Sequence, residues 1–92
     1  IFCCNDLMAM GAVNACQRMG RRVPQDISVI GYDNTALSQY TAPKLTTIDQ
    51  NMGDLGREAA RLMLKQIEEN VTENVVLANT VVERETTGFR VE

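Results

Sequence analysis

The sequence contains no histidine and no tryptophan, and only two of its 92 residues are proline. Histidine is the commonest general base and metal ligand, so its absence removes the usual centre of both kinds of site. The chain also has no G-x-S-x-G elbow, no P-loop and no paired metal ligands. We therefore expect a protein that is not an enzyme and that holds neither a metal nor a cofactor.

Excess positive charge and long apolar runs are also missing. Nine Lys and Arg stand against twelve Asp and Glu, and no segment gathers the basic residues that a phosphate backbone requires. No stretch reaches the roughly 18 apolar residues of a membrane span, and the N-terminal residues do not resemble a signal peptide. We expect these residues to contact neither DNA nor a membrane.

Cys3, Cys4 and Cys16 lack the C-x-x-C spacing of zinc and redox sites. An odd number of such residues is typical of buried, reduced thiols in a cytoplasmic protein. The composition, 45% hydrophobic and 23% charged, is that of a globular chain. Because the sequence opens on a strand-like run without an initiator methionine, we expect further sequence upstream.

The first part of the chain alternates between strand and helix patterns. Residues 1–4 resemble a strand, and 27–30 are so uniformly apolar that they predict a central parallel strand covered on both faces. Between them lies a helix with Gly20 as its C-cap. This βαβ unit predicts an α/β fold with a parallel sheet. The helical spacing assigns its apolar face to Leu7, Met8, Gly11, Ala12, Ala15 and Met19.

The second part begins with a loop, residues 33–44, that contains one helical turn at 37–40. Residues 45–48 ("LTTI") predict a short strand, and 52–69 form a strongly amphipathic helix pattern. Residues 75–77 and 80–84 predict two further strands.

Polar side chains follow the ends of three predicted strands. Asn5 follows residues 1–4, Asp33 follows 27–30, and Gln50 follows "LTTI". In open α/β sheets ligands bind at the carboxyl ends of the strands, and a carboxylate with two amides suits a polyol. Gly31 is expected to let the backbone turn so that Asp33 faces the ligand. The alternatives stay open at this point: Asn5 as a helix cap, Asp33 as an Asx-turn residue, and Gln50 as a solvated residue.

Five segments in this order are similar to one known family: "IFCCNDLMAMGA", "RVPQDISVIGYDN", "PKLTTIDQ", "LGREAARLMLKQI" and "VVERETT". They resemble the C-terminal part of the effector-binding region of LacI/GalR-family transcriptional repressors, over essentially the whole chain. The resemblance implies a fold like that of type I periplasmic binding proteins, in which two subdomains joined by crossing strands close on a small ligand, commonly a sugar. It also matches Asn5, Asp33 and Gln50 to ligand-contacting positions.

The same resemblance implies an organisation of the chain. Residues 1–46 would form the C-terminal subdomain, 47–79 would cross to an absent N-terminal subdomain, and 80–92 would return. Homodimers would form partly through Met10, Leu37 and Tyr40, although Met10 and Leu37 could equally be core residues. DNA would be contacted only by a separate N-terminal domain that is not in this chain. The implied function is a cytoplasmic, sugar-responsive repressor, and the alternative is a secreted solute receptor of the same bilobal fold.

Overall fold

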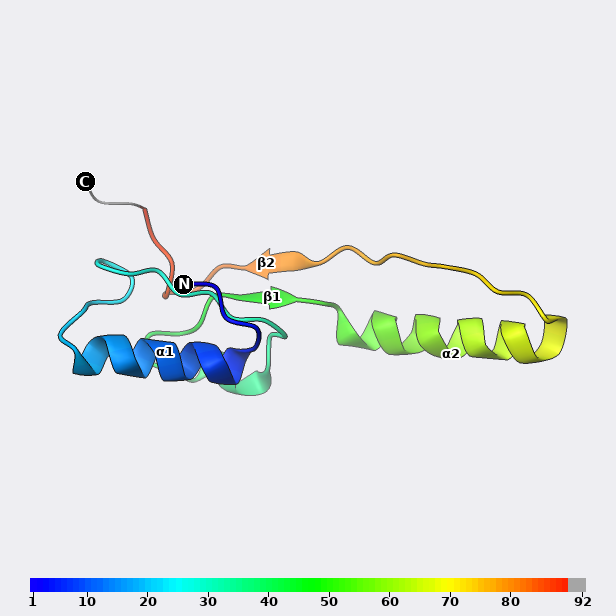
Figure 1. Ribbon diagram of the computed structural model, residues 1–92, viewed down its shortest axis with the longest axis horizontal. Coiled ribbons are helices and arrows are strands. Elements are labelled where there is room, and N and C mark those ends of the chain that lie inside the picture. Colours follow the sequence, from blue (N-terminus) through cyan, green and yellow to red (C-terminus); the bar gives the residue numbers. More distant parts are fainter. Residues whose placement is uncertain (90–92) are drawn as a thin grey trace. The chain divides into compact units, whose positions relative to one another are not determined.

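The computed structural model describes residues 1–89, whose helices and strands are labelled in Figure 1. Contacts within the chain divide it into two compact units, Gln50–Asn79 and the remainder. The elements in chain order are α1 (Asp6–Arg18), the 3-10 helix η1 (Ala36–Gln39), β1 (Thr47–Asp49), α2 (Met52–Glu69) and β2 (Thr80–Val82).

The first unit is built on extended segments that lie side by side. Phe2 and Ile30 form a parallel bridge on one side of residues 29–33. On the other side, Gly31 N–H donates to the carbonyl oxygen of Thr46 at 2.9 Å. Residues 29–33 therefore lie between two neighbours, as the βαβ pattern predicted. The predicted strands 1–4 and 27–30 are joined only by this isolated bridge, however, and neither forms a regular strand.

β1 and β2 form an antiparallel pair, seen side by side in Figure 1, with Thr47 opposite Val82 and Asp49 opposite Thr80. The predicted strand 80–84 is thus shorter than expected. The predicted strand 75–77 is wrong, because no segment of the described chain forms a hydrogen-bonded ladder with it. The expected returning segment runs to residue 92, of which 90–92 lie outside the described residues.

Helix α1 ends as its sequence predicts. Gly20 adopts a φ of 76°, in the left-handed region where glycine is favoured. Gly20 N–H donates to Gln17 O at 3.1 Å, and Arg21 N–H donates to Cys16 O at 2.8 Å. These two bonds form a Schellman motif, which satisfies carbonyl groups that the end of a helix would leave without partners.

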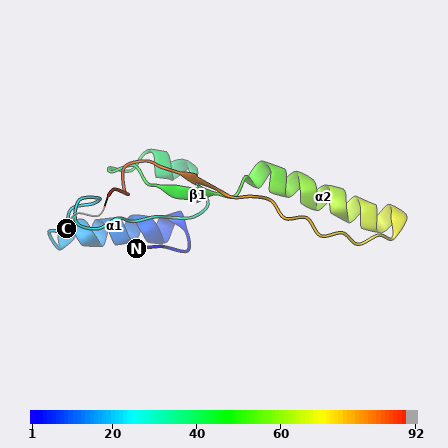
Figure 2. The ribbon, with the colours of Figure 1, turned by 90° about the horizontal axis from the view of Figure 1, so that it is seen from above.

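The buried face of α1 is not the predicted one. Ala9, Val13 and Cys16 are buried, whereas Leu7 and Met19 are each 77% exposed. Nearly every side chain from Leu7 to Cys16 is apolar or small, so the helical period alone cannot select a face. Helix α1 runs alongside the extended segments in both Figure 1 and Figure 2. Ala9 is fully buried on the side of α1 that faces Gly31. The core cluster consists of Ala9, Val13, Cys16, Val23, Val29 and Leu45.

Two further expectations are corrected by burial. Val29 and Gly31 are buried, but Ile30, on the other face of the same segment, is partly exposed. The second face of the central strand is therefore only partly covered in the described chain. Among the thiols, Cys16 is buried and Cys4 is exposed.

The second unit contains α2, whose bounds, Met52–Glu69, are the predicted ones. Its polar face is tied to the following extended chain, because Lys65 Nζ lies 2.9 Å and Arg61 Nη2 3.7 Å from carboxylate oxygens of Glu73. The apolar stripe includes Met63 and Ile67, both exposed in the described chain. No helix within residues 1–89 is long and apolar enough to cross a membrane.

Candidate functional site

The candidate site lies where neighbouring parallel segments end. Cys3 N–H donates to Ile30 O, and Asp33 N–H donates to Ile48 O, both at 2.9 Å. Asn5 and Asp33 therefore follow the carboxyl ends of paired segments and lie at the same edge of the sheet. Gln50 is the first residue of the second unit. Its assignment to the same site stays a prediction.

Asn5 caps helix α1. Its backbone is extended, with a φ of −154°, and its Oδ1 accepts a hydrogen bond from Met8 N–H at 2.8 Å. The capping role that the sequence left open is thus real. Because the cap uses Oδ1, a ligand could use the two Nδ2 donors of Asn5 without breaking the helix terminus.

The loop after the central segment has an unusual backbone. Asp33 and Asn34 have φ angles of 106° and 53°, in a region that side chains other than glycine rarely adopt. Such residues cost about 1 to 3 kcal/mol each and persist only when their surroundings hold them. Asp33 N–H is bound to Ile48 O, and Asn34 N–H lies 3.2 Å from Thr47 Oγ1. The chain therefore turns at Asp33 and Asn34, directly after the extended segment.

Gly31 has a different role from the one expected. A Cβ at Gly31 would overlap Asp6 Oδ1 and would lie 3.0 Å from Leu45 Cδ2 and 3.3 Å from Ala9 Cβ. Its φ is not positive, unlike those of the two loop residues. Gly31 is needed because α1 and the side chain of Asp6 approach the backbone closely, and not because the chain turns there.

Asp6 is the main residue that the sequence analysis missed. It is 0% exposed, and its carboxylate accepts from Thr35 N–H at 2.7 Å, Thr35 Oγ1 at 2.9 Å and Thr47 Oγ1 at 2.6 Å. These bonds join the start of α1 to the loop and to β1, and they satisfy a buried charge. A small residue at position 31 was the only sequence signal for this arrangement.

Arg84 was also missed, because it was assigned only to the end of a strand. Its Nη2 donates to Asn34 Oδ1 at 2.7 Å. Its Nη1 donates to Ser38 Oγ at 2.6 Å and to Leu45 O at 2.9 Å. The side chain is partly buried. One guanidinium thus contacts the candidate ligand loop, η1 and the segment that leads to β1.

Aromatic side chains lie beside this edge. The rings of Phe2 and Tyr32 have centroids 6.4 Å apart and planes inclined at 72°, an edge-to-face pair. Phe2 is exposed and Tyr32 is partly buried. Successive side chains of an extended segment point to opposite faces, so Tyr32 is on the face away from the buried Gly31.

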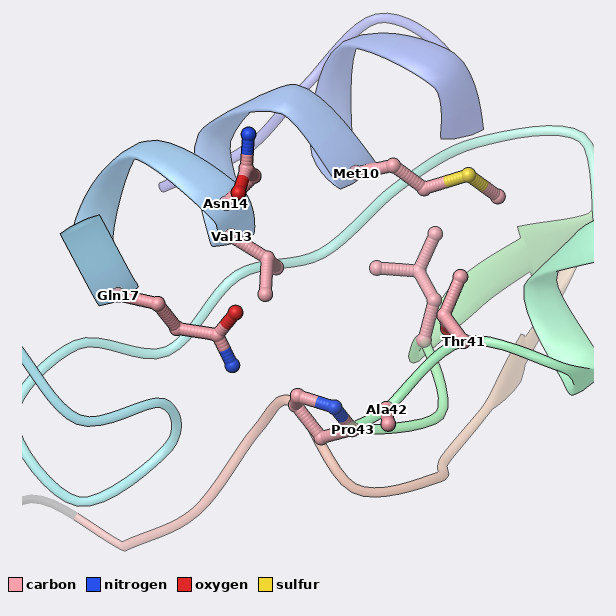
Figure 3. A pocket seen from close by; sticks show the side chains of 8 residues that line it. Met10, Val13, Asn14, Gln17, Thr41, Ala42 and Pro43 are labelled. Carbon is pink, nitrogen blue, oxygen red and sulfur yellow. The ribbon is translucent and has the colours of Figure 1, made fainter.

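The residues expected at a dimer contact lie elsewhere on the first unit. Leu37 and Tyr40 are 62% and 80% exposed, on either side of the fully buried Ser38. Met10 packs against the core and lines a pocket of about 190 Å³ between α1 and residues 41–43. Figure 3 shows Met10, Val13 and Gln17 on the helix side of this pocket and Thr41 and Pro43 on the loop side. The alternative that these are core residues fits Met10 but not Leu37. The dimer contact stays a prediction.

No group of three or more His, Cys, Asp or Glu side chains among residues 1–89 is arranged to hold a metal ion. The polar groups at the candidate edge include the partly buried carboxylate of Asp33 and the amide of Asn5. Such a mixture can exchange hydrogen bonds with a neutral, hydroxyl-rich molecule.

Comparison with known proteins finds a matching family and similar transcriptional repressors. Residues 1–87 match the family described as periplasmic binding protein-like domain. The HTH-type transcriptional repressor PurR of Pasteurella multocida is 48% identical over 77 residues, which cover 84% of this chain and 23% of that protein. The chain therefore spans about a quarter of the length of this curated relative.

Solved structures show the same likeness. A LacI family transcriptional regulator from Enterococcus faecium with bound ribose has a TM-score of 0.81 and 38% identity, covering 94% of this chain and 33% of that one. The dimeric Lac repressor with a C-terminal deletion has a TM-score of 0.84 and 41% identity, covering 94% of this chain and 32% of that one.

Proposed function

Because this chain belongs to the periplasmic binding protein-like domain family, as its motifs predicted, we propose that it forms one wall of the effector site of a transcriptional repressor. The effector is a small sugar. The observation that carries this proposal is the shared carboxyl edge, where Asn5 and Asp33 follow paired parallel segments. Similarity to the transcriptional repressor PurR and to a LacI family transcriptional regulator with bound ribose supports it.

Each side chain has a distinct task in this proposal. The Asp33 carboxylate accepts hydrogen bonds from sugar hydroxyls, and such bonds to a charged group contribute about 1.5 to 3 kcal/mol each. The Asn5 amide donates through Nδ2 while Oδ1 caps α1. Gln50 both donates and accepts, at the start of the second unit.

Ligand binding acts by shifting a conformational equilibrium. A sugar that contacts both subdomains favours the arrangement in which it is enclosed, by as much as its affinities for the two states differ. Residues 1–46 and 80–92 form one subdomain in this scheme, and 47–79 cross to the other. The chain's division at Asp49 and Thr80 into two compact units supports such an organisation.

The protein acts as a homodimer in the cytoplasm, and a separate N-terminal domain binds DNA. Exposure of Leu37 and Tyr40 supports a contact between copies at that surface. Similarity to the dimeric Lac repressor supports it as well. Similarity to a transcriptional repressor and to a LacI family transcriptional regulator favours this role over a solute receptor or an enzyme.

Calorimetry with ribose on the intact protein that carries this chain tests the proposal. We expect Asp33→Ala to weaken ribose binding at least roughly tenfold, the loss of about one charge-assisted hydrogen bond. Asp26→Ala is the matched control, because Asp26 is in the same unit and pairs with the exposed Arg22. Unchanged affinity in Asp33→Ala would remove Asp33 from the site, and wild-type protein that binds no ribose would count against this effector.

A further inference from the structure

The loop that carries Asp33 is held by groups from three separate parts of the first unit. The first part is β1, where Thr47 Oγ1 accepts from Asn34 N–H and Ile48 O accepts from Asp33 N–H. Asp6, from α1, accepts the next N–H, that of Thr35. The third group is Arg84, which binds the side chain of Asn34. Two consecutive residues with positive φ are therefore retained by contacts distant in sequence.

Arg84 differs from the other two groups because it makes several contacts at once. Its guanidinium reaches three oxygen atoms, on Asn34, Ser38 and Leu45, at 2.6 to 2.9 Å. Its own N–H also donates to Thr46 Oγ1 at 2.9 Å, which fixes the backbone from which the side chain extends. A planar guanidinium suits such a set of acceptors, whereas an ammonium group is a compact point donor.

The chain position of Arg84 adds to this geometry. It follows β2 by two residues, and β2 begins where the second unit ends. The strand by which the chain returns to the first unit is therefore connected, through one side chain, to the loop that presents Asp33.

We propose that Arg84 is a positioning residue for the ligand: it holds Asn34, and through it the Asp33 loop, in the conformation that binds. This inference rests on the proposed function, since it concerns the same site. Arg84 itself does not contact the sugar. Loss of its contact with Asn34 allows the loop to leave its positive-φ conformation, and the free protein must then restore that conformation before it binds.

Arg84→Lys and Asn34→Gly, alone and combined, test this in the intact protein. Glycine accepts the φ of 53° at position 34, so that Asn34→Gly removes the side-chain contact without adding backbone strain. We expect each single variant to weaken ribose binding about tenfold, and the double variant to be no weaker than either one. Arg22→Lys, which alters an exposed guanidinium of the same unit, should bind as the wild type does.

Backbone hydrogen exchange without ligand gives a second readout. In Arg84→Lys we expect the amides of Asp33 and Asn34 to exchange about tenfold faster, while those of α1 keep their wild-type rates. Multiplied effects in the double variant, or unchanged exchange in the loop, would overturn the proposal. If Arg84→Lys does not fold, Asn34→Gly decides alone, and wild-type ribose affinity there refutes the inference. If the wild type binds no ribose, the proposed effector fails while the exchange comparison still decides the role of Arg84.

Discussion

Replacing Asn5 by serine and by alanine separates its capping role from its proposed ligand role. Asn5 Oδ1 caps α1 through Met8 N–H at 2.8 Å. Serine caps a helix about as well as asparagine, whereas alanine costs about 1 kcal/mol. Serine has no amide group, so neither variant can offer the Nδ2 donors to a sugar hydroxyl.

The two variants should therefore differ in stability but not in affinity. Asn5→Ala should lower the free energy of unfolding by about 1 kcal/mol, and Asn5→Ser should leave it close to the wild-type value. Both should weaken ribose binding roughly three- to tenfold, because a neutral hydrogen bond contributes about 0.5 to 1.5 kcal/mol.

Urea unfolding and calorimetry with ribose on the intact protein measure the two effects. Asn14→Ser is the control, since Asn14 is an exposed residue of α1 away from its N-terminus. Wild-type ribose affinity in Asn5→Ser would refute the reasoning, because Asn5 would then be a cap and nothing more. Equal destabilisation by serine and alanine would contradict the capping argument.

Two predictions concern the folded state itself. Gly31→Ala should destabilise the protein by about 2 to 6 kcal/mol in urea unfolding, because its Cβ displaces the buried carboxylate of Asp6. A Cβ added at Gly11 meets no neighbouring side chain or segment within 4 Å, so Gly11→Ala should instead stabilise the protein by about 0.4 to 1 kcal/mol. Equal changes in stability for the two variants would contradict the steric argument. Hydrogen bonds from the side chain and backbone of Arg22 lower the pKa of Asp26 from 3.8 to about 2. A depressed carboxyl pKa stabilises the fold above pH 3.8 and loses that contribution as the pH falls towards 2, so Asp26→Asn should remove this part of the acid dependence. An acid unfolding curve that Asp26→Asn leaves unchanged would contradict the assignment.

Much of the fold could be predicted from patterns among residues close in the sequence. The bounds of α2, the glycine C-cap of α1 and the helical turn near residue 37 all depend on residues close in sequence, and each was predicted. The family resemblance rested on ordered motifs and was confirmed by the match over residues 1–87. Backbone dihedral preferences and hydrophobic period act over a few residues, so a sequence displays them directly.

Packing partners far apart in the chain decided the rest. The buried face of α1, the need for Gly31, and the roles of Asp6 and Arg84 were not predicted. Asp6 becomes a buried, satisfied carboxylate only when Thr35 and Thr47 are brought to it, 29 and 41 residues away. The sequence by itself determined the two helices, the short helical turn and the approximate positions of β1 and β2. Only the tertiary structure decided which long-range hydrogen bonds hold them, because a side chain's partners depend on the whole chain path.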